Sequence, residues 1–396
     1  MPELKKDKLK ALKELKAKVV KAYGSDILMT GKEAVERGAL SKIIIPTPSL
    51  ELNQALYCGG FGGIVELFGP PASGKTSLAI ETLAKAQKED PNFIGMWLET
   101  EHSIFPELLE QHGVDLERLV YINQEDFESG ENALDIIYSA VRNGIPNLVI
   151  VNSVAGIVPK QETEEDLSKQ NIALVARMMS KFFRKIVGAA GKNKTDMIFI
   201  NQIRDNVGVM YGDTTTTTGG RALGFYASQR IKLTACKVQK EDPIEPEKGI
   251  KVSCIVYKNR FAGMHNPNSK CTYYAMFDTG IDSIISIPKT LADNGIFMRS
   301  GAWWYYPNKE NPATIAGIQC KFNSQNALIN ALRDNKDFLT EVKKFISVNE
   351  VSAEEKQEIT KDEQSNADFV QSTKDPTEDK NDDMDEEIAL HPEEMI

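Results

Sequence analysis

The feature that most constrains this chain is an octapeptide, GPPASGKT, at residues 69–76. It fits the pattern G-x-x-x-x-G-K-[S/T] and stands between an apolar β-rich run and an amphipathic stretch. Such a loop curls its backbone N–H groups round phosphate oxygens, and the following helix adds the positive end of its dipole. Lys75 would charge-pair with the β- and γ-phosphates, and Thr76 would ligate Mg²⁺. The pattern predicts a nucleoside triphosphate site built from Gly69, Pro70, Pro71, Ala72, Ser73, Gly74, Lys75, Thr76 and Ser77.

The middle of the chain alternates between short β-rich runs and helical stretches. The runs at 64–68, 93–98, 148–151, 197–201, 231–234 and 252–257 are typical of strands, and those at 77–87, 106–112, 132–143 and 172–188 of helices. This alternation predicts an α/β domain with a mainly parallel, twisted sheet covered on both faces. Later strands are free to pair antiparallel.

Hydrolysis also needs a group that activates or orients water near the γ-phosphate. The second predicted strand runs into Glu99-Thr-Glu101-His102 at its carboxyl end, where open α/β sheets bind their ligands. Strand alternation would put Glu99 and Glu101 on the same side. A solvated carboxylate pair at a strand end is the alternative interpretation.

Charge is unevenly distributed along the 396 residues. The net charge is −10, but residues 349–396 hold 17 acidic and 4 basic side chains, which leaves 43 basic against 40 acidic in the rest. A near-neutral body with an acidic tail suits a protein that binds a polyanion and regulates that binding. The tail has few aromatic residues and no sustained apolar period, so we expect it to be disordered.

Several classes of protein are disfavoured. No apolar run approaches the roughly 18 residues of a membrane span, and no apolar stretch follows the N-terminal lysines as in a secretory signal. The five cysteines are scattered without a C-x-x-C pair, which argues against a disulfide framework or a zinc site. We therefore expect a cytoplasmic protein that does not use a membrane.

Four segments are predicted. They are an N-terminal helix and oligomerisation segment (1–42), an ATPase core (43–279), a small C-terminal α+β domain (280–348) and the acidic tail (349–396). The stretch 5–23 is amphipathic; it is either a solvated helix or one that docks its apolar stripe on a neighbouring copy. The aromatic cluster at 303–306 is more typical of a core than of a binding surface.

A set of collinear motifs closely resembles the bacterial RecA family. The matching segments are 69–77, 101–102, 176–180, 197–204, 208–220, 222–223, 225–228, 258–260 and 301–303, spread over nearly the whole folded part of the chain. The resemblance implies a RecA-type core and an ATP- and Mg²⁺-dependent recombinase. Such a protein forms helical filaments on single-stranded DNA, pairs it with homologous duplex, and acts in DNA repair and the SOS response at the nucleoid. Single-strand-binding and loader proteins are further partners that it implies.

The resemblance also implies roles for individual residues. Glu101 matches the catalytic glutamate that activates water, and Gln202 the γ-phosphate sensor at the root of the second DNA-binding loop. Lys258 and Arg260 match paired cations that reach the neighbour's ATP, so that hydrolysis would require a filament. Phe225 matches an aromatic residue that links the subunit contact to that loop.

The DNA-binding segments also have a chemical rationale. Residues 207–220 are rich in glycine and threonine, which suits backbone N–H and hydroxyl contacts to phosphates without base reading. An ordinary long loop is the alternative. A first loop is expected near 160–171. The predicted DNA-binding residues are Arg177, Ser180, Arg184, Arg204, Val207, Gly208, Thr218, Gly219, Gly220 and Arg221.

Two sites depart from the family pattern. Asn152 stands where the family has the Mg²⁺-linked aspartate, so we expect weaker, indirect metal binding and slower hydrolysis, with Glu99 as a source of the missing charge. An Asn152→Asp variant should then shift the Mg²⁺ titration. Phe105 and Leu108 stand where the family has an aspartate and a tyrosine that hold the adenine of ATP. We therefore expect Phe105 to stack on the nucleobase and the site to discriminate less strictly between nucleobases.

Three functions compete at this point. The first is the recombinase, the second a DNA-bound ATP filament that scarcely hydrolyses, and the third a RecA-fold DNA motor. The threonine-rich loop and the C-terminal aromatic unit argue against the motor. Asn152 motivates the filament scaffold.

Overall fold

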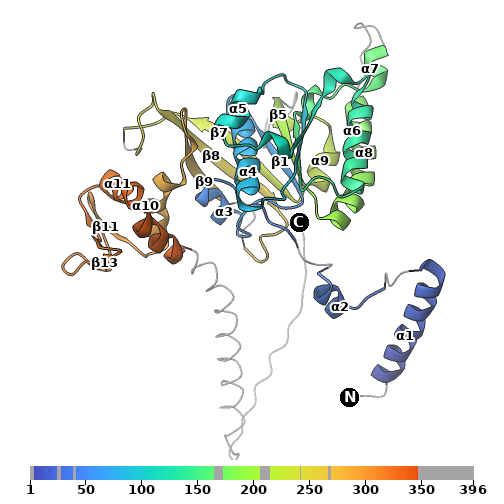
Figure 1. Cartoon of the computed structure of the whole chain (residues 1–396), viewed down its shortest axis with the longest axis horizontal. Helices are drawn as coiled ribbons and strands as arrows, with labels where there is room; N and C mark the ends of the chain where they lie inside the picture. Colours follow the sequence, from blue (N-terminus) through green and yellow to red (C-terminus); the bar gives the residue numbers. More distant parts are fainter. Residues whose placement is uncertain are drawn as a thin grey trace, which may run out of the picture.

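The core of the molecule is one large twisted sheet (Figure 1). The computed structural model describes residues 4–24, 28–38, 42–164, 173–205, 215–240, 242–265 and 269–346. The strand order is β10-β9-β8-β7-β1-β5-β4-β2-β3, and β6 pairs with β5. Strands β3, β2, β4, β5, β1 and β7 run parallel, and β8, β9 and β10 continue antiparallel. The bounds are β1 Ile64–Gly69, β2 Gly95–Glu99, β3 Leu119–Asn123, β4 Leu148–Asn152, β5 Asp196–Asp205, β6 Thr215–Thr217, β7 Gln229–Cys236, β8 Gly249–Asn259, β9 Lys270–Met276 and β10 Gly280–Ile281.

Helices cover both faces of the sheet, because its central strands are apolar on both sides. Strands β1, β2 and β4 are buried along their whole length. One face packs on α3 (Leu50–Ala55), α4 (Lys75–Glu89) and α5 (Pro106–Gln111) through a core that includes Leu78, Leu83 and Trp97. The other face packs on α6 (Gly130–Arg142), α8 (Leu174–Asn193) and α9 (Arg221–Tyr226) through Phe183 and Phe199.

The predicted α/β class and mainly parallel sheet are confirmed, with antiparallel pairing in the later strands. The predicted strands and helices correspond to observed ones, although β5 and α8 run several residues further than expected. Strands β3, β6, β9 and β10 of this sheet were not predicted. In β3 only Ile122 is buried, because it lies at the sheet edge, and so the apolar signal of that segment is weak.

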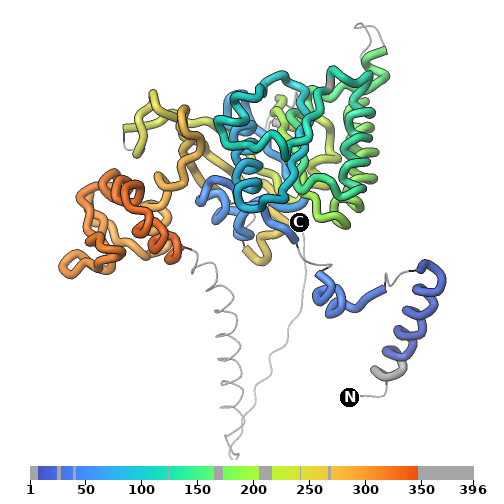
Figure 2. Tube along the Cα trace, viewed as in Figure 1, coloured from blue at the N-terminus to red at the C-terminus, as the bar shows by residue number. Residues whose placement is uncertain are grey.

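A smaller unit follows the sheet (Figure 2). It contains α10 (Ser283–Asp293), α11 (Gln325–Asp334), a helical stretch at 336–346, and short strands β11 (Met298–Ser300), β12 (Trp303–Tyr305), β13 (Thr314–Ile315), β14 (Ile318–Gln319) and β15 (Lys321–Phe322). It has its own apolar core, in which Trp304 is buried while Trp303 is largely exposed. The aromatic cluster is thus partly core. The main sheet reaches Ile281, just beyond the predicted boundary at 279, and the predicted tail lies outside the described residues.

The N-terminal segment extends away from the sheet (Figures 1 and 2). It consists of α1 (Leu4–Tyr23) and α2 (Gly31–Glu36), which are joined by an ion pair between Lys16 and Glu33. Several apolar side chains of α1 are exposed, among them Leu9 and Tyr23. None of the helices in the described ranges is long and apolar enough to cross a membrane.

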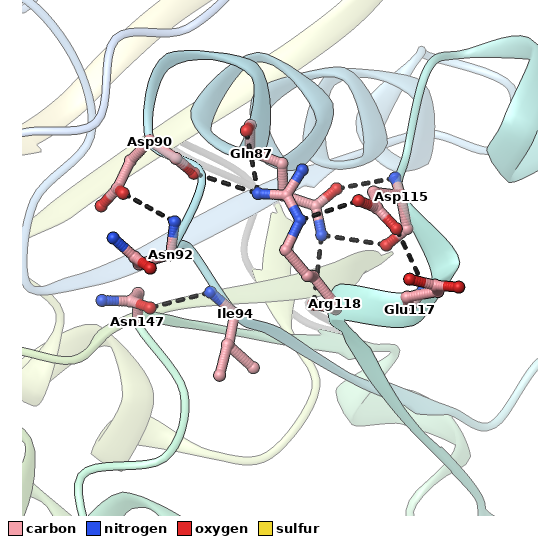
Figure 3. A network of polar contacts seen from close by, with 8 residues as sticks. All are labelled: Gln87, Asp90, Asn92, Ile94, Asp115, Glu117, Arg118 and Asn147. Carbon is pink, nitrogen blue, oxygen red and sulfur yellow. Dashed lines mark hydrogen bonds and ion pairs between the residues drawn. The ribbon is translucent and has the colours of Figure 1, made fainter.

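Arg118 fastens the far end of α4 to the start of β3 (Figure 3). One guanidinium nitrogen of Arg118 donates to the carbonyl oxygens of Gln87 and Asp90, and another donates to the Asp115 carboxylate at 2.8 Å. The side-chain amide of Gln87 donates to the carbonyl oxygens of Asp115 and Arg118, and its oxygen accepts from the Asp115 N–H. Because these bonds satisfy the carbonyls at the end of α4, they hold the helix that begins at the phosphate loop.

A buried carboxylate also lies at this amino-terminal edge of the parallel strands, at the opposite end of the strands from the phosphate loop. Asp196, at the start of β5, is only 6% exposed; its Oδ1 accepts a 2.5 Å bond from the Gly63 N–H, and its Oδ2 has no partner among the described residues. Burial raises the pKa of Asp196 to about 7, against the smaller opposing effects of that hydrogen bond and of Lys42. The fold therefore favours the protonated carboxyl, and stability should fall as pH rises from about 4 through about 7.

Asp196→Asn should remove this pH dependence, because the amide keeps the acceptor for Gly63 and carries no charge. We expect a Tm several degrees above that of the natural protein at pH 8, on the order of 2–4 °C per kcal/mol, and a much smaller difference at pH 5. Thermal unfolding at both pH values measures this. The control is Asp293→Asn, which changes an exposed carboxylate of α10. Equal Tm differences at pH 5 and pH 8 would contradict the assignment.

Candidate active site and nucleic-acid interface

The phosphate loop connects β1 to α4, as the sequence pattern predicts. A Cβ on Gly69 would lie 2.1 Å from the carbonyl oxygen of Leu233 on β7, so only glycine fits there. Gly74 precedes α4 with φ +83°, in the left-handed region that favours glycine. Ala72 also has a positive φ, +55°. The loop is thus shaped by close backbone packing at one end and by a left-handed turn at the other.

Lys75 lies inside this loop. Its Nζ donates to the carbonyl oxygens of Gly69 (3.2 Å) and Pro70 (2.7 Å) and to Ser73 Oγ (3.3 Å). Burial lowers the pKa of Lys75, and the Glu101 carboxylate opposes that effect. The ammonium group is therefore held at the loop, one residue before Thr76 in the first turn of α4.

Glu101 follows β2, and its carboxylate lies between β4 and β5. Its Oε1 accepts from Ser153 Oγ and from Gln202 Nε2, the latter at 2.9 Å. Gln202 is paired in register with Gly69, which explains why it lies at the same edge of the sheet. The structure thus places Lys75, Glu101 and Gln202 at one edge. This arrangement suits a carboxylate that orients water and an amide that senses a nearby anion.

Strand alternation does not relate Glu99 to Glu101, because β2 ends at Glu99. Glu99 is fully buried, and its carboxylate turns inward, where Oε2 accepts from Asn152 Nδ2 at 3.0 Å. The alternative of a solvated carboxylate pair is therefore wrong for Glu99. Its negative charge does lie beside Asn152, but both of its oxygens already accept hydrogen bonds from protein groups.

The residues present fit a magnesium ion held partly through water. Asn152 is fully buried, and its Oδ1 has no hydrogen-bond partner among the described residues. Such a buried acceptor is suited to a metal-bound water. The hydroxyl of Thr76, beside Lys75, is the other oxygen donor that the sequence predicts.

Phe105 and Leu108 differ in exposure, although both were assigned to the adenine side. Phe105 precedes α5 and is 53% exposed, so its ring is accessible to a base. Leu108 packs against the core formed with α4. Only Phe105 is therefore free to stack on a ligand.

Lys258 and Arg260 lie near the amino ends of the parallel strands β1 and β7, whereas the phosphate loop follows the carboxyl end of β1. Lys258 Nζ donates to the carbonyl oxygens of Gly224 (2.9 Å) and Phe225 (3.0 Å), and Arg260 also donates to Phe225 at 2.9 Å. Burial, reinforced by Arg260, lowers the pKa of Lys258. The backbone N–H of Arg260 donates to the carbonyl oxygen of Ser228. The backbone N–H of Ser228 in turn donates to the carbonyl oxygen of Ile64, at the start of β1.

The length of β1 separates these cations from their own phosphate loop. Ile64 and Gly69 are five residues apart in an extended strand, or about 16 Å. Phe225, which anchors both cations, is 67% exposed. Both cations are therefore held near the start of β1, away from Lys75; Arg260 is exposed and Lys258 partly buried.

The end of the predicted second DNA-binding loop packs on α8. A Cβ on Gly220 would lie 2.6 Å from the Cβ of Ala176, and one on Gly219 would lie 2.9 Å from a methyl of Val154. The predicted residues Arg177, Ser180 and Arg184 occur at helical spacing on α8, and both arginines are exposed. The structure thus brings the glycine turn and this helix together.

The other predicted DNA-binding residues surround the same region. Arg221 lines a hollow of about 360 Å³ together with Phe68, Thr216, Thr217, Gly220, Gly224, Arg230 and Tyr257. Arg204 is exposed on β5, where it pairs with Thr216 of β6, and the backbone carbonyl of Thr218 accepts from Asn201. Val207 and Gly208 lie outside the described residues, as does most of the first loop.

A polar link that the sequence did not predict joins β1 to the predicted second DNA-binding loop. Glu66, fully buried in β1, accepts from Arg230 on β7 at 2.5 Å and from Asn201 Nδ2 at 3.0 Å. The same Asn201 amide bonds the Thr218 carbonyl at 2.9 Å. A glutamate in the middle of the apolar run IVELFG was the available signal, since a buried carboxylate needs partners.

Comparison with known proteins assigns the family. A family model described as the RecA N-terminal domain matches residues 10–282. The RecA protein of Fusobacterium nucleatum is 38% identical over 306 residues, 76% of this chain and 77% of that protein. The RecA proteins of Streptomyces rimosus (36% over 346 residues, 86% and 85%) and Bacteroides thetaiotaomicron (39% over 303 residues, 76% and 88%) are also similar.

The chain belongs to the RecA family. It is accordingly a recombinase of DNA recombination and repair, built on the RecA fold. RecA proteins are DNA-dependent ATPases that use ATP with Mg²⁺, bind single-stranded DNA and self-associate. The fold and family expected from the sequence are therefore confirmed.

Gly69→Ala should weaken ATP binding at least tenfold, because its methyl group would displace either the loop or β7. The matched control is Ala72→Gly, which should bind ATP like the natural protein, since glycine adopts a positive φ without strain. Titration with a fluorescent ATP analogue measures affinity, and thermal unfolding checks the fold. Natural affinity in a folded Gly69→Ala protein would contradict this account of the loop.

Proposed function

We propose that this chain forms a helical filament on single-stranded DNA, with ATP bound between neighbouring copies, and pairs that DNA with homologous duplex. One observation carries the proposal. Lys75, Glu101 and Gln202 lie at one edge of the sheet, and Lys258 and Arg260 at the other. One copy therefore cannot supply both sets to the same nucleotide, whereas two successive copies can.

The proposed chemistry divides among few residues. Lys75 and the loop N–H groups hold the phosphates, and the Glu101 carboxylate orients and deprotonates the attacking water. Mg²⁺, held by Thr76 and through water by Asn152, would neutralise phosphate charge. Gln202 donates to Glu101 and lies on β5, the strand that leads into the second DNA-binding loop, so a change at the γ-phosphate is transmitted there.

The proposed DNA contacts use backbone groups rather than base edges. The glycine turn at Gly219 and Gly220, with the exposed Arg177, Arg184 and Arg221, offers N–H groups and positive charge to phosphates. Base pairing itself then tests homology, and binding weakens as salt rises. Exposed Leu9 and Tyr23 on α1 support docking of that helix on a neighbouring copy. Single-strand-binding proteins, loaders and a place at the nucleoid in the cytoplasm belong to this proposal.

Asn152 supports a second candidate function, a DNA-bound filament that scarcely hydrolyses ATP. A neutral ligand holds Mg²⁺ less tightly than a carboxylate, so we propose slower turnover than in a chain with aspartate there. ATP turnover with and without single-stranded DNA separates the two functions. Strand unwinding by ring-shaped particles would instead indicate a motor.

A strand-exchange assay tests the recombinase most directly. Homologous single-stranded and duplex DNA are mixed with the protein and either ATP or a non-hydrolysable analogue. We expect joint molecules with both nucleotides, and complete exchange with ATP. A heterologous duplex is the control. The absence of joint molecules with either nucleotide would overturn the proposal.

Mixing two inactive variants tests the shared nucleotide site. Glu101→Gln and Arg260→Ala should each lower DNA-dependent ATP turnover at least a hundredfold. Equal mixtures, combined before DNA is added, should regain about a quarter of the natural rate, because about that share of junctions has both residues intact. Mixing Glu101→Gln with Lys75→Ala is the control and should regain nothing, since both changes affect the same side. No recovery in the first mixture would contradict action between copies.

The acidic tail is proposed to compete with incoming duplex. Deleting residues after Asn349 removes a net charge of −13 and should strengthen duplex capture several-fold at low salt. Filter binding of duplex DNA by preformed filaments measures this. Equal affinity of the truncated and full-length chains would count against such a role.

A further inference from the structure

The buried carboxylate of Glu99 is the most heavily bonded polar group near the candidate active site. Its Oε2 accepts from Trp97 Nε1 (2.8 Å) and Asn152 Nδ2 (3.0 Å). Its Oε1 accepts from the backbone N–H groups of Glu101 (3.0 Å) and Ser103 (3.2 Å) and from Ser103 Oγ (3.2 Å). Glu99 is 0% exposed, so these five donors replace water entirely.

These bonds fix the turn that carries Glu101. The chain leaves β2 at Glu99 and turns through His102, which has φ +51°. Two of the five donors are backbone N–H groups of this turn, on either side of His102. Thr100 ties the same turn to β4 through a 2.7 Å bond from its N–H to the carbonyl of Asn152. The position of the Glu101 carboxylate therefore depends on the carboxylate two residues before it.

Asn152 is the hydrogen-bond donor that β4 offers to the Glu99 carboxylate. The two residues are paired in register on β2 and β4. The Asn152 amide donates to Glu99 and, at 3.0 Å, to Ser103 Oγ. An aspartate has no N–H to donate, so it would put two carboxylates in contact in a buried site.

We propose that Glu99 is a positioning residue for Glu101 and that Asn152 is its required neutral partner. The pairing needs one hydrogen-bond donor and one acceptor, so the carboxylate can stand at position 99 or at position 152, but not at both and not at neither. The inference rests on the proposed function of Glu101 in hydrolysis. It also predicts that an Asn152→Asp variant changes two things at once: the affinity for Mg²⁺ and the repulsion between positions 152 and 99.

A double-mutant cycle tests the exchange. In Glu99→Gln two amide N–H groups face each other, and in Asn152→Asp two carboxylates face each other. Each single variant should lower kcat at least tenfold and leave KM for ATP within about threefold. The combined variant Glu99→Gln/Asn152→Asp restores a donor facing an acceptor and should turn over faster than either single variant. Its recovery should be partial, because Trp97 loses an acceptor. Glu101→Gln is the comparison for complete loss of the group that Glu99 positions.

Thermal unfolding of the same proteins gives a readout that does not need activity. The combined variant should have a higher Tm than either single variant, and it should half-saturate at lower Mg²⁺ in nucleotide binding than the natural protein. A combined variant that is slower and less stable than both single variants overturns the proposal. Single variants whose kcat and Tm both match the natural protein overturn it as well. If the natural protein shows no DNA-stimulated turnover, the proposed function fails, while the Tm cycle still decides the pairing.

Discussion

The structure depends on the register of four parallel strands, β1, β5, β4 and β2. Parallel strands end at a common edge, and here the register pairs Gly69 with Gln202 and Glu99 with Asn152. The predicted phosphate loop, an amide on the strand before the predicted second DNA-binding loop and the turn bearing Glu101 are thereby brought together from positions far apart in the sequence. The apolar side chains on both faces of these strands fix that register, since a shift by one residue would expose them. The burial of both faces of the sheet thus sets the strand register, and the register places the side chains of the site.

The sequence predicted this edge because its signals are local. The phosphate loop, the strand before it and the helix after it are encoded in one short segment, and the apolar runs of β4 and β5 are equally plain. The inward turn of Glu99 could not be predicted, because it depends on where β2 ends and on what β4 offers beside it. The Glu66–Arg230 pair joins residues 164 positions apart, which no local pattern reports. Asp196 lies one residue before the predicted strand at 197–201, and its burial depends on the approach of Gly63, which no local pattern reports.

The departure at Asn152 has a different meaning once its neighbour is known. In the sequence it is the loss of a charge from a metal site. In the structure the charge is present one strand away, on Glu99, and the Asn152 amide holds it there. The buried Oδ1 without a partner among the described residues remains available to a metal-bound water. We therefore propose that position 152 serves both the turn of Glu101 and the metal.

The two edges of the sheet explain why polymer, nucleotide and DNA should depend on one another. The phosphate loop and the root of the predicted second DNA-binding loop share one edge, and Lys258 and Arg260 belong to the other. Sedimentation of the purified protein with ATP, Mg²⁺ and a single-stranded oligonucleotide tests this most directly. The account predicts large DNA-bound assemblies that require all three components. A protein that stays monomeric with all three present would contradict it.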